Sequence, residues 1–305
     1  MRLKKLLPIL LIFILGFFFW QAKKSSSSVW DGSSRINLVI ASGEVIVASL
    51  EPEKNLTLLK LPKNLYLDIP HGLGKYQLGS VYELGKLEKR GGKLLRETIQ
   101  DYLGVPTDGH IRTSIINHQS STIKKYILNC LVLSTLSRGE TNFSKWDLIR
   151  LWWEIKKLRS DKVKFIDLEE TNILLQAELP DGSLIWETEF FRLDELVKKY
   201  FSDQKIEKEG IEIEILNATE HLGLANKVSR LIANMGGGVV AIGNSEEKNE
   251  TSKIKFRDET LKKSYTLKKL EKILQVKAEI GEMAESRADL LILIGEAYWE
   301  RLTKP

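Results

Sequence analysis

The side chains that could do chemistry in this chain are charged residues at turns between short apolar runs. Glu44, Lys63, Asp68 and Lys75 lie in or beside such turns, and Arg138 follows farther along the chain. A carboxylate can accept a proton or ligate a divalent cation, and a lysine or an arginine can hold a phosphate group. Each residue taken singly also has an ordinary explanation. Asp68, in the run Asp-Ile-Pro, is typical of a turn, and Lys75 is typical of a solvated loop.

Patterns typical of several other chemistries are missing from the sequence. There is no nucleophile elbow and no P-loop, and the four histidines are scattered without the spacing of a metal site. The three glycines at 236–238 follow a predicted helix, so they indicate a helix stop and not a phosphate-binding loop. Cys130 is the single cysteine, which excludes an intramolecular disulfide and a cysteine-based metal site; its apolar surroundings predict a buried thiol.

The composition is that of a folded chain with room for one large or two modest domains. The 305 residues are 43% hydrophobic and 29% charged, which excludes a disordered chain. The formal net charge of +5 is compatible with phosphate-bearing polymers or anionic lipid headgroups, and also with an ordinary solvated surface. Basic and acidic residues are interleaved along most of the chain, so we favour the ordinary surface.

The first residues carry the pattern of a membrane anchor. A basic segment at 1–5 precedes an uncharged run at 6–22, which ends in an aromatic cluster with Trp20 and is followed by two lysines. The run is near the lower limit for a spanning helix, and the excess of basic residues before it predicts a cytoplasmic N-terminus. We therefore predict an uncleaved single-pass anchor at 1–24 in the cell membrane, an extracytoplasmic bulk, and a Ser-rich tether at 25–34.

A first α/β domain is predicted at residues 35–202. Alternating apolar residues at 36–77 indicate half-buried strands separated by glycine and proline turns. An apolar stripe at 94–103 predicts an amphipathic helix that ends at Gly104. A short strand is expected at 111–116, a helix at 142–159 capped by Asn142 or Ser144, and a last short helix at 194–201.

The helix predicted at 142–159 contains three tryptophans, Trp146, Trp152 and Trp153. Indoles on a helix could stack on carbohydrate rings, or they could pack in the core. Trp146 and Trp152 lie with Phe143 and Ile155 on one face of this helix, which is typical of a core-facing stripe, so we favour packing for the tryptophans.

A polar linker at 203–210 separates a second, smaller domain at 211–305. Strands are predicted at 211–217, 239–242, 252–256 and 288–294, and helices at 222–235 and 267–274. This β-α-β-β-α-β order implies a compact two-layer α/β module.

Two parts of the chain resemble the LytR-CpsA-Psr family of cell-envelope proteins. In the first domain the order is strand, Pro-centred turn, strand, L-P-K-N, D-I-P and a Gly-rich loop, and later G-G, helix and L-G-V-P. In the second, the runs IEIEILNA, GLA and ADLLILIG resemble the LytR C-terminal domain. The resemblance implies an N-terminal transmembrane helix, an α/β LytR-CpsA-Psr-like domain with a mixed sheet, and a small two-layer α/β C-terminal domain.

Family members resemble phosphotransferases that move a polyprenyl-pyrophosphate-linked glycopolymer onto peptidoglycan, and this chain departs from their site pattern. Where the family has Arg and Asp before a strand, this chain has S-G-E at 42–44; where it has Pro-Arg-Asp, this chain has P-K-N at 62–64. Lysine loses the bidentate fork of arginine, and asparagine loses the charge that would hold Mg²⁺. A third, arginine-rich segment has no counterpart between 113 and 142, where Arg138 is the nearest arginine.

The resemblance therefore implies a reduced set of site residues. Glu44, Lys63 and Arg138 are the catalytic candidates, Lys63 and Lys75 the substrate-binding candidates, and Glu44 the metal candidate, with Mg²⁺ as cofactor only if the protein is active.

These departures lead to two functional hypotheses. We favour an extracytoplasmic cell-envelope protein that is catalytically degenerate and binds polyprenyl-linked glycopolymer, peptidoglycan or a partner envelope protein. The alternative is an active, Mg²⁺-dependent phosphotransferase. No DNA-binding helix pair is visible in the sequence, so nucleic acid is not expected as a partner.

Overall fold

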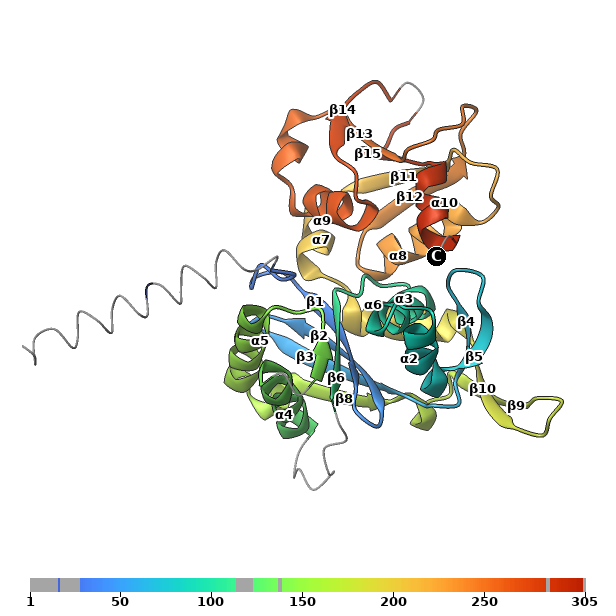
Figure 1. Ribbon diagram of the computed structural model, residues 1–305. Helices are drawn as coiled ribbons and strands as arrows, with labels where there is room; N and C mark the ends of the chain where they lie inside the picture. Colours follow the sequence, from blue (N-terminus) through green and yellow to red (C-terminus); the bar gives the residue numbers. More distant parts are fainter. Residues whose placement is uncertain (1–15, 17–27, 114–122, 137–138, 284–285, 304–305) are drawn as a thin grey trace, which may run out of the picture.

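The protein folds into two α/β domains that contact each other (Figure 1). The computed structural model describes residues 16, 28–113, 123–136, 139–283 and 286–303.

The first domain is built on a mixed six-stranded sheet. Its sheet has the order β7-β6-β1-β2-β3-β8, in which β1 pairs parallel with β6 and β3 parallel with β8, while the other neighbours are antiparallel. The strands of this domain are β1 (Ile36–Ala41), β2 (Val45–Glu51), β3 (Asn55–Leu61), β4 (Tyr66–Ile69), β5 (Gly74–Gln77), β6 (Gly109–Thr113), β7 (Gly139–Thr141), β8 (Val163–Asp167), β9 (Leu174–Glu178) and β10 (Leu184–Thr188). Its helices are α2 (Leu78–Leu87), α3 (Gly92–Leu103), α4 (Ile123–Thr135), α5 (Lys145–Lys157) and α6 (Phe190–Phe201), with short 3₁₀ turns at Ser160–Lys162 and Leu168–Glu170.

Helices cover both faces of this sheet, which gives three layers. Leu38 and Ile40 of β1 pack in one hydrophobic cluster with α4 and α5, whereas Val39 packs in another with α2, α3 and α6. All seven residues of β2 are buried. β1, β2 and β3, which were predicted as half-buried, are therefore buried on both faces, whereas β4 and β5 are not. The prediction missed this because Ala48, Ser49 and other small or polar residues interrupt the continuous apolar run that a fully buried strand usually shows.

The helix boundaries agree with the predicted caps. Ser144 accepts a hydrogen bond from Asp147 N at 3.1 Å, and the Asp147 carboxylate accepts one from Ser144 N, so the two form a capping box at the start of α5. At the end of α3, Gly104 adopts a left-handed conformation with φ 62°, as the predicted glycine stop requires.

Residues 28–34 pack on the first domain, although the sequence predicted a tether there. Trp30 is 3% exposed and its indole Nε1 donates to Ser34 O at 2.7 Å. Ser28 Oγ donates to Asp147 Oδ1 at 2.6 Å, which ties this segment to the start of α5.

The predicted localisation as a single-pass membrane protein is corrected by the structure. Among the described residues no helix is long and apolar enough to cross a membrane. Helices α4 and α5, for example, have 13 residues each, against about 20 in a spanning helix. The anchor predicted at 1–24 lies outside the described residues, apart from Gly16.

The second domain has a five-stranded sheet with helices on the side that faces the first domain (Figure 1). The sheet order is β12-β11-β15-β13-β14, and β13 runs antiparallel to β15. Its elements are α7 (Gln204–Glu209), β11 (Glu212–Asn217), α8 (Leu224–Asn234), β12 (Gly238–Asn244), β13 (Lys253–Phe256), a 3₁₀ turn at Glu259–Lys263, α9 (Tyr265–Leu274), β14 (Ala278–Ile280), β15 (Leu290–Ile294) and α10 (Glu296–Thr303).

Three features of this domain differ from the prediction. The segment predicted as a polar linker forms α7, because Asp203 caps its first turn and Ile206 is buried in the second core. The edge strand β14 and the terminal helix α10 were not predicted, since both are short and have few apolar residues.

Arg230 of α8 and Asp194 of α6 hold the two domains together. The Arg230 guanidinium donates to Asp194 from Nε at 2.9 Å and from Nη2 at 2.7 Å. It also donates to the carbonyl oxygens of Asp101 and Tyr102, and Asn234 Nδ2 donates to Leu103 O at 3.0 Å. These three carbonyls belong to the last turn of α3, where a helix leaves its acceptors unpaired. The second domain therefore caps a helix of the first.

Replacing Asp194 should weaken this domain contact. Asp194→Ala leaves the three-quarters-buried Arg230 side chain without its carboxylate, and we expect a loss of about 1–3 kcal/mol in unfolding free energy. Denaturant unfolding measures the loss, and small-angle X-ray scattering should show a larger radius of gyration. Glu195→Ala, a change at the exposed neighbouring carboxylate, is the control and should do neither. Equal behaviour of the two variants would show that the contact is not held by this ion pair.

Candidate functional site

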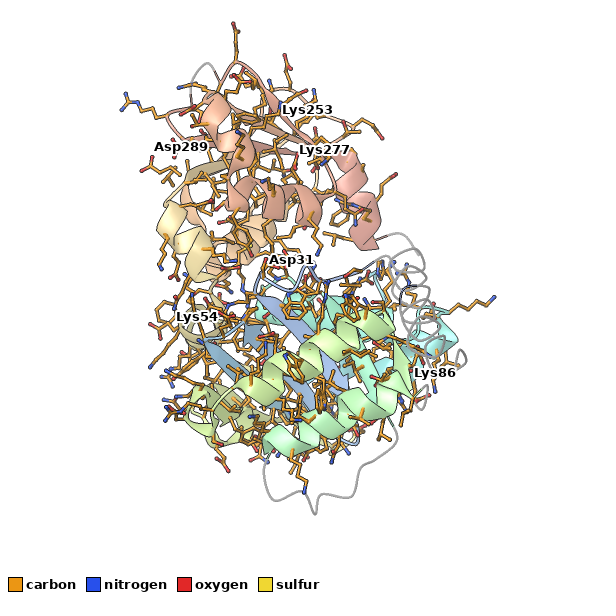
Figure 2. All side chains as sticks on the ribbon, turned by 90° about the vertical axis from the view of Figure 1, so that its left-hand side faces the viewer. Asp31, Lys54, Lys86, Lys253, Lys277 and Asp289 are labelled. Carbon is orange, nitrogen blue, oxygen red and sulfur yellow. The ribbon has the colours of Figure 1, made fainter. Side chains whose placement is uncertain are left out.

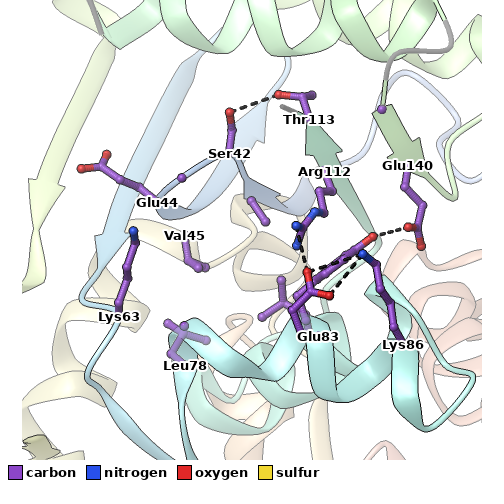
Figure 3. Close-up of a pocket in the computed structure, with 16 residues that line it drawn as sticks. Ser42, Glu44, Val45, Lys63, Leu78, Glu83, Lys86, Arg112, Thr113 and Glu140 are labelled. Atoms are coloured by element: carbon purple, nitrogen blue, oxygen red, sulfur yellow. Dashed lines mark hydrogen bonds and ion pairs between the residues drawn. The ribbon is translucent and has the colours of Figure 1, made fainter. Parts of the chain in front are cut away.

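A pocket of about 710 Å³ opens where β1 and β6 end (Figure 3). Because these strands are parallel and adjacent, with Ala41 opposite Arg112, the residues that follow them reach the same edge of the sheet. Helix α2 and the short strand β7 complete the walls. The lining residues with polar or charged side chains are Ser42, Glu44, Lys63, Tyr82, Glu83, Lys86, Arg112, Thr113 and Glu140.

Arg112 lies at the centre of the pocket and shares a carboxylate with Lys86. Its guanidinium carbon is 3.8 Å from the centroid of the Tyr82 ring, and its Nη2 is 2.9 Å from Glu83 Oε1. Lys86 Nζ is 3.2 Å from the other oxygen of Glu83. The Glu83 and Arg112 side chains are 57% and 38% exposed, so solvent screens this ion pair and it contributes little to stability.

Glu140 is held on the opposite wall by Tyr82. The Tyr82 hydroxyl donates to Glu140 Oε2, and Gly92 N at the start of α3 donates to Glu140 Oε1 at 3.4 Å. The hydrogen bond from Tyr82 lowers the pKa of Glu140, while burial and the same bond raise the pKa of Tyr82. Both oxygens of the Glu140 carboxylate therefore already accept hydrogen bonds.

Glu44 and Lys63, both predicted as site residues, lie at one end of the pocket (Figure 3). Glu44 follows β1, and its Oε1 is 3.8 Å from Lys60 Nζ, which makes a shorter contact of 2.7 Å with Asp167. The hydrogen bond to Asp167 is the main cause that raises the pKa of Lys60. Lys63 is exposed, and no carboxylate of the described chain lies within ion-pair distance of its ammonium group.

The structure does not bring the other two predicted residues to this pocket. Lys75 lies in β5 and lines a different cavity, which the β4–β5 hairpin forms with the second domain, together with Asp68. Arg138 lies outside the described residues. Lys75 and Lys63 therefore line different cavities, because the hairpin directs Lys75 toward the domain boundary, and substrate binding by Lys75 stays a prediction.

Sequence reasoning missed Arg112, Glu83, Lys86 and Glu140. A strand was predicted at 111–116, but nothing in the sequence shows that β6 is the parallel neighbour of β1, which is what places Arg112 beside Ser42 and Glu44. Tyr82, Glu83 and Lys86 share one face of α2, a helix that was not assigned.

The described residues of the pocket do not form an all-protein magnesium site. Mg²⁺ needs oxygen ligands that converge in octahedral geometry. Glu83, Glu140 and Glu44 come from three separate elements, and each already contacts a cation or a phenol. Across the described chain no group of three or more His, Cys, Asp or Glu residues could hold a metal ion. Among the described residues Glu44 therefore does not belong to a group of three or more potential metal ligands.

The back of the pocket is a rigid polar cluster above a buried thiol. Thr113 Oγ1 donates to Ser42 Oγ at 3.1 Å, and the Tyr126 hydroxyl donates to Ser42 O at 2.9 Å. Burial raises the pKa of Tyr126 to about 12 and that of the Cys130 thiol to about 11. Cys130 is fully buried, as predicted.

Comparison with protein families identifies the second domain. Residues 210–298 match the family described as LytR cell envelope-related transcriptional attenuator. The predicted LytR C-terminal domain is thus confirmed. No curated protein matches the chain.

Solved structures with a similar fold align with somewhat more than half of the chain. They include Bacillus subtilis TagT, at 15% identity over 56% of this chain and 91% of that chain, with a TM-score of 0.43. Bacillus subtilis TagV aligns at 12% identity over 54% and 94%, with a TM-score of 0.41. A transcriptional regulator from Enterococcus faecalis aligns at 12% identity over 56% and 87%, with a TM-score of 0.43. TagT is also known bound to LIIa-WTA.

Cys130 should be inert in the folded protein. A thiol with a raised pKa and no exposed surface is a poor nucleophile at neutral pH. We expect no reaction with Ellman's reagent under native conditions and one equivalent after denaturation in guanidinium chloride. Rapid labelling of Cys130 in the native protein would contradict this prediction, because the thiol could react only if α4 and α5 moved readily away from the sheet.

Proposed function

We propose that this protein binds a polyprenyl-pyrophosphate-linked glycopolymer during cell-envelope assembly and does not catalyse its transfer. The observation that carries the proposal is the charge arrangement of the pocket. Lys63, Lys86 and Arg112 supply cations for a pyrophosphate, whereas Glu44, Glu83 and Glu140 each already contact a cation or a phenol, and the described residues contain no group of three or more potential metal ligands. A different enzyme would then transfer the polymer to peptidoglycan or to a partner envelope protein.

An anionic ligand would bind by replacing Glu83. The Glu83 side chain is the more exposed member of its pair with Arg112, so it can leave the guanidinium without unfolding α2. The Arg112 guanidinium would then donate two parallel hydrogen bonds to one phosphate, and Lys86 would add a second positive charge. Lys63, at the other end of the pocket, would contact the second phosphate or the first sugar-linked oxygen.

Removing the competing carboxylate should strengthen binding. Glu83→Gln keeps the shape of the side chain but frees Arg112 and Lys86, so we expect several-fold tighter binding of farnesyl pyrophosphate, and about tenfold weaker binding for Arg112→Ala. Isothermal titration of the full chain measures both. Glu88→Gln, a change in an exposed carboxylate just beyond α2, is the control. If neither the Glu83 nor the Arg112 variant changes the affinity, the ligand does not bind in this pocket.

The alternative function is an active phosphotransferase that uses Glu44, Lys63 and Arg138. The closeness of Glu44 and Lys63 at one end of the pocket favours it. We expect no Mg²⁺-dependent release of phosphate from a polyprenyl pyrophosphate by the purified protein. A Mg²⁺-dependent release that Glu44→Ala abolishes would establish the alternative and overturn the proposal of a binding protein.

A further inference from the structure

The β9–β10 hairpin has one edge that no other strand of the described chain covers. Figure 1 shows the hairpin extending beyond the body of the first domain, on the side away from α4 and α5. Strand β10 joins the segment between β3 and β4: Trp186 N donates to Asn64 O at 3.0 Å, and Asn64 Nδ2 donates to Leu184 O at 3.3 Å. Strand β9, in contrast, pairs with β10 alone. β9 is therefore an open sheet edge.

The hydrogen bonds of the hairpin show which backbone groups of β9 face this open edge. Leu179 N donates to Ser183 O at the turn, and Glu189 N donates to Ile173 O at the other end, both at 2.9 Å. In an antiparallel pair, residues that bond to the partner strand alternate with residues whose backbone groups point away. The bonds that β10 makes to Asn64 fit the same alternation. The residues of β9 with outward N–H and C=O groups are Leu174, Gln176 and Glu178.

The side chains of β9 present an apolar face and a polar face. Leu175, which is 57% exposed, and Ala177 lie on one face, whereas Gln176 and Glu178 lie on the other. Glu178 is exposed and lies opposite Leu184 of β10. A strand that paired with β9 would therefore set apolar side chains beside Leu175 and Ala177, and basic side chains beside Glu178.

The hairpin and its flanking residues carry only negative charge. Residues 167–191 contain seven carboxylates and no lysine, arginine or histidine, in a chain with a net charge of +5. Only Asp167 and Glu189 among them form ion pairs with residues of the described chain. The seven are Asp167, Glu169, Glu170, Glu178, Asp181, Glu187 and Glu189. Basic side chains occur over the rest of both domains, among them Lys54, Lys86, Lys253 and Lys277 (Figure 2).

We propose that β9 is a docking edge for an extended segment of a partner protein in which basic and apolar residues alternate. The segment would add a third strand to the hairpin, so that main-chain hydrogen bonds supply affinity and alternate side chains supply specificity. Charge complementarity selects this occupant. A second copy of the chain would set β9 against the same carboxylates, and an anionic polymer would be repelled by them. The edge shares no residue with the lining of the pocket, so the inference does not depend on what the pocket binds.

Three fluorescent octapeptides test for strand addition by anisotropy with the full chain. The first alternates lysine and valine, the second has the same charge but a proline in place of a central valine, and the third alternates glutamate and valine. We expect the lysine–valine peptide to bind most tightly. The proline peptide should bind about tenfold more weakly, because proline lacks the N–H that a strand donates, and the glutamate peptide should not bind.

Variants of β9 separate backbone pairing from charge attraction. Gln176→Pro removes one outward N–H and none of the bonds to β10, so it should weaken binding of the lysine–valine peptide about tenfold, whereas Gln176→Ala should leave it unchanged. Glu178→Lys should weaken binding about fivefold because it reverses a charge beside the docked strand. Glu246→Lys, the same change at an exposed carboxylate of the second domain, is the control and should have no effect.

Hydrogen exchange tests the same contact without any substitution. The amides of Leu174, Gln176 and Glu178 should become protected when the lysine–valine peptide is added. Equal binding of the proline and lysine–valine peptides, or of the Gln176→Pro and Gln176→Ala variants, would show that the hairpin attracts charge without accepting a strand. Absence of peptide binding, or protection confined to other segments, would show that β9 is not the docking edge. Each of these results would overturn the proposal.

Discussion

The parallel pairing of β1 with β6 is the constraint on which the candidate site depends. It joins two segments that are far apart in the sequence and brings Ser42 and Glu44 to the same edge as Arg112 and Thr113. The pairing is stable because helices bury both faces of the sheet: α4 and α5 cover one, and α2, α3 and α6 cover the other. The positions of the residues at the strand ends therefore follow from the packing of the core.

Helix α3 connects this pocket to the second domain. Its first residue, Gly92, donates to Glu140 in the pocket wall, and the carbonyls of its last turn accept from Arg230 and Asn234. His71, in the β4–β5 hairpin, donates its backbone N–H to Leu302 O of the second domain. The C-terminal domain therefore helps to hold α3, which forms part of the pocket wall.

Much of the fold could be predicted from sequence, but the pairing that makes the site could not. Alternation and turn residues located β1 to β3, and the caps Ser144 and Gly104 located the ends of α5 and α3. Lys63 and Glu44 were identified because they occupy motif positions. Arg112 and Glu140 occupy no motif, and only the sheet order brings them together. Packing was favoured for the tryptophans of α5, but Trp153 is 53% exposed. A wide apolar stripe on a helix has the same sequence pattern whether its margin is covered or exposed.

The central claim is that the pocket binds a pyrophosphate through cations alone. Arg112 and Lys86 share Glu83, so an anionic ligand that uses these two cations must displace that carboxylate, and among the described residues no group of three acidic, histidine or cysteine side chains could hold a metal. The most direct measurement is isothermal titration of the full chain with a short-chain polyprenyl pyrophosphate, first in EDTA and then in Mg²⁺. We predict binding in EDTA that Mg²⁺ does not strengthen. Binding that appears only with Mg²⁺ would mean that a metal site exists, and would contradict this account.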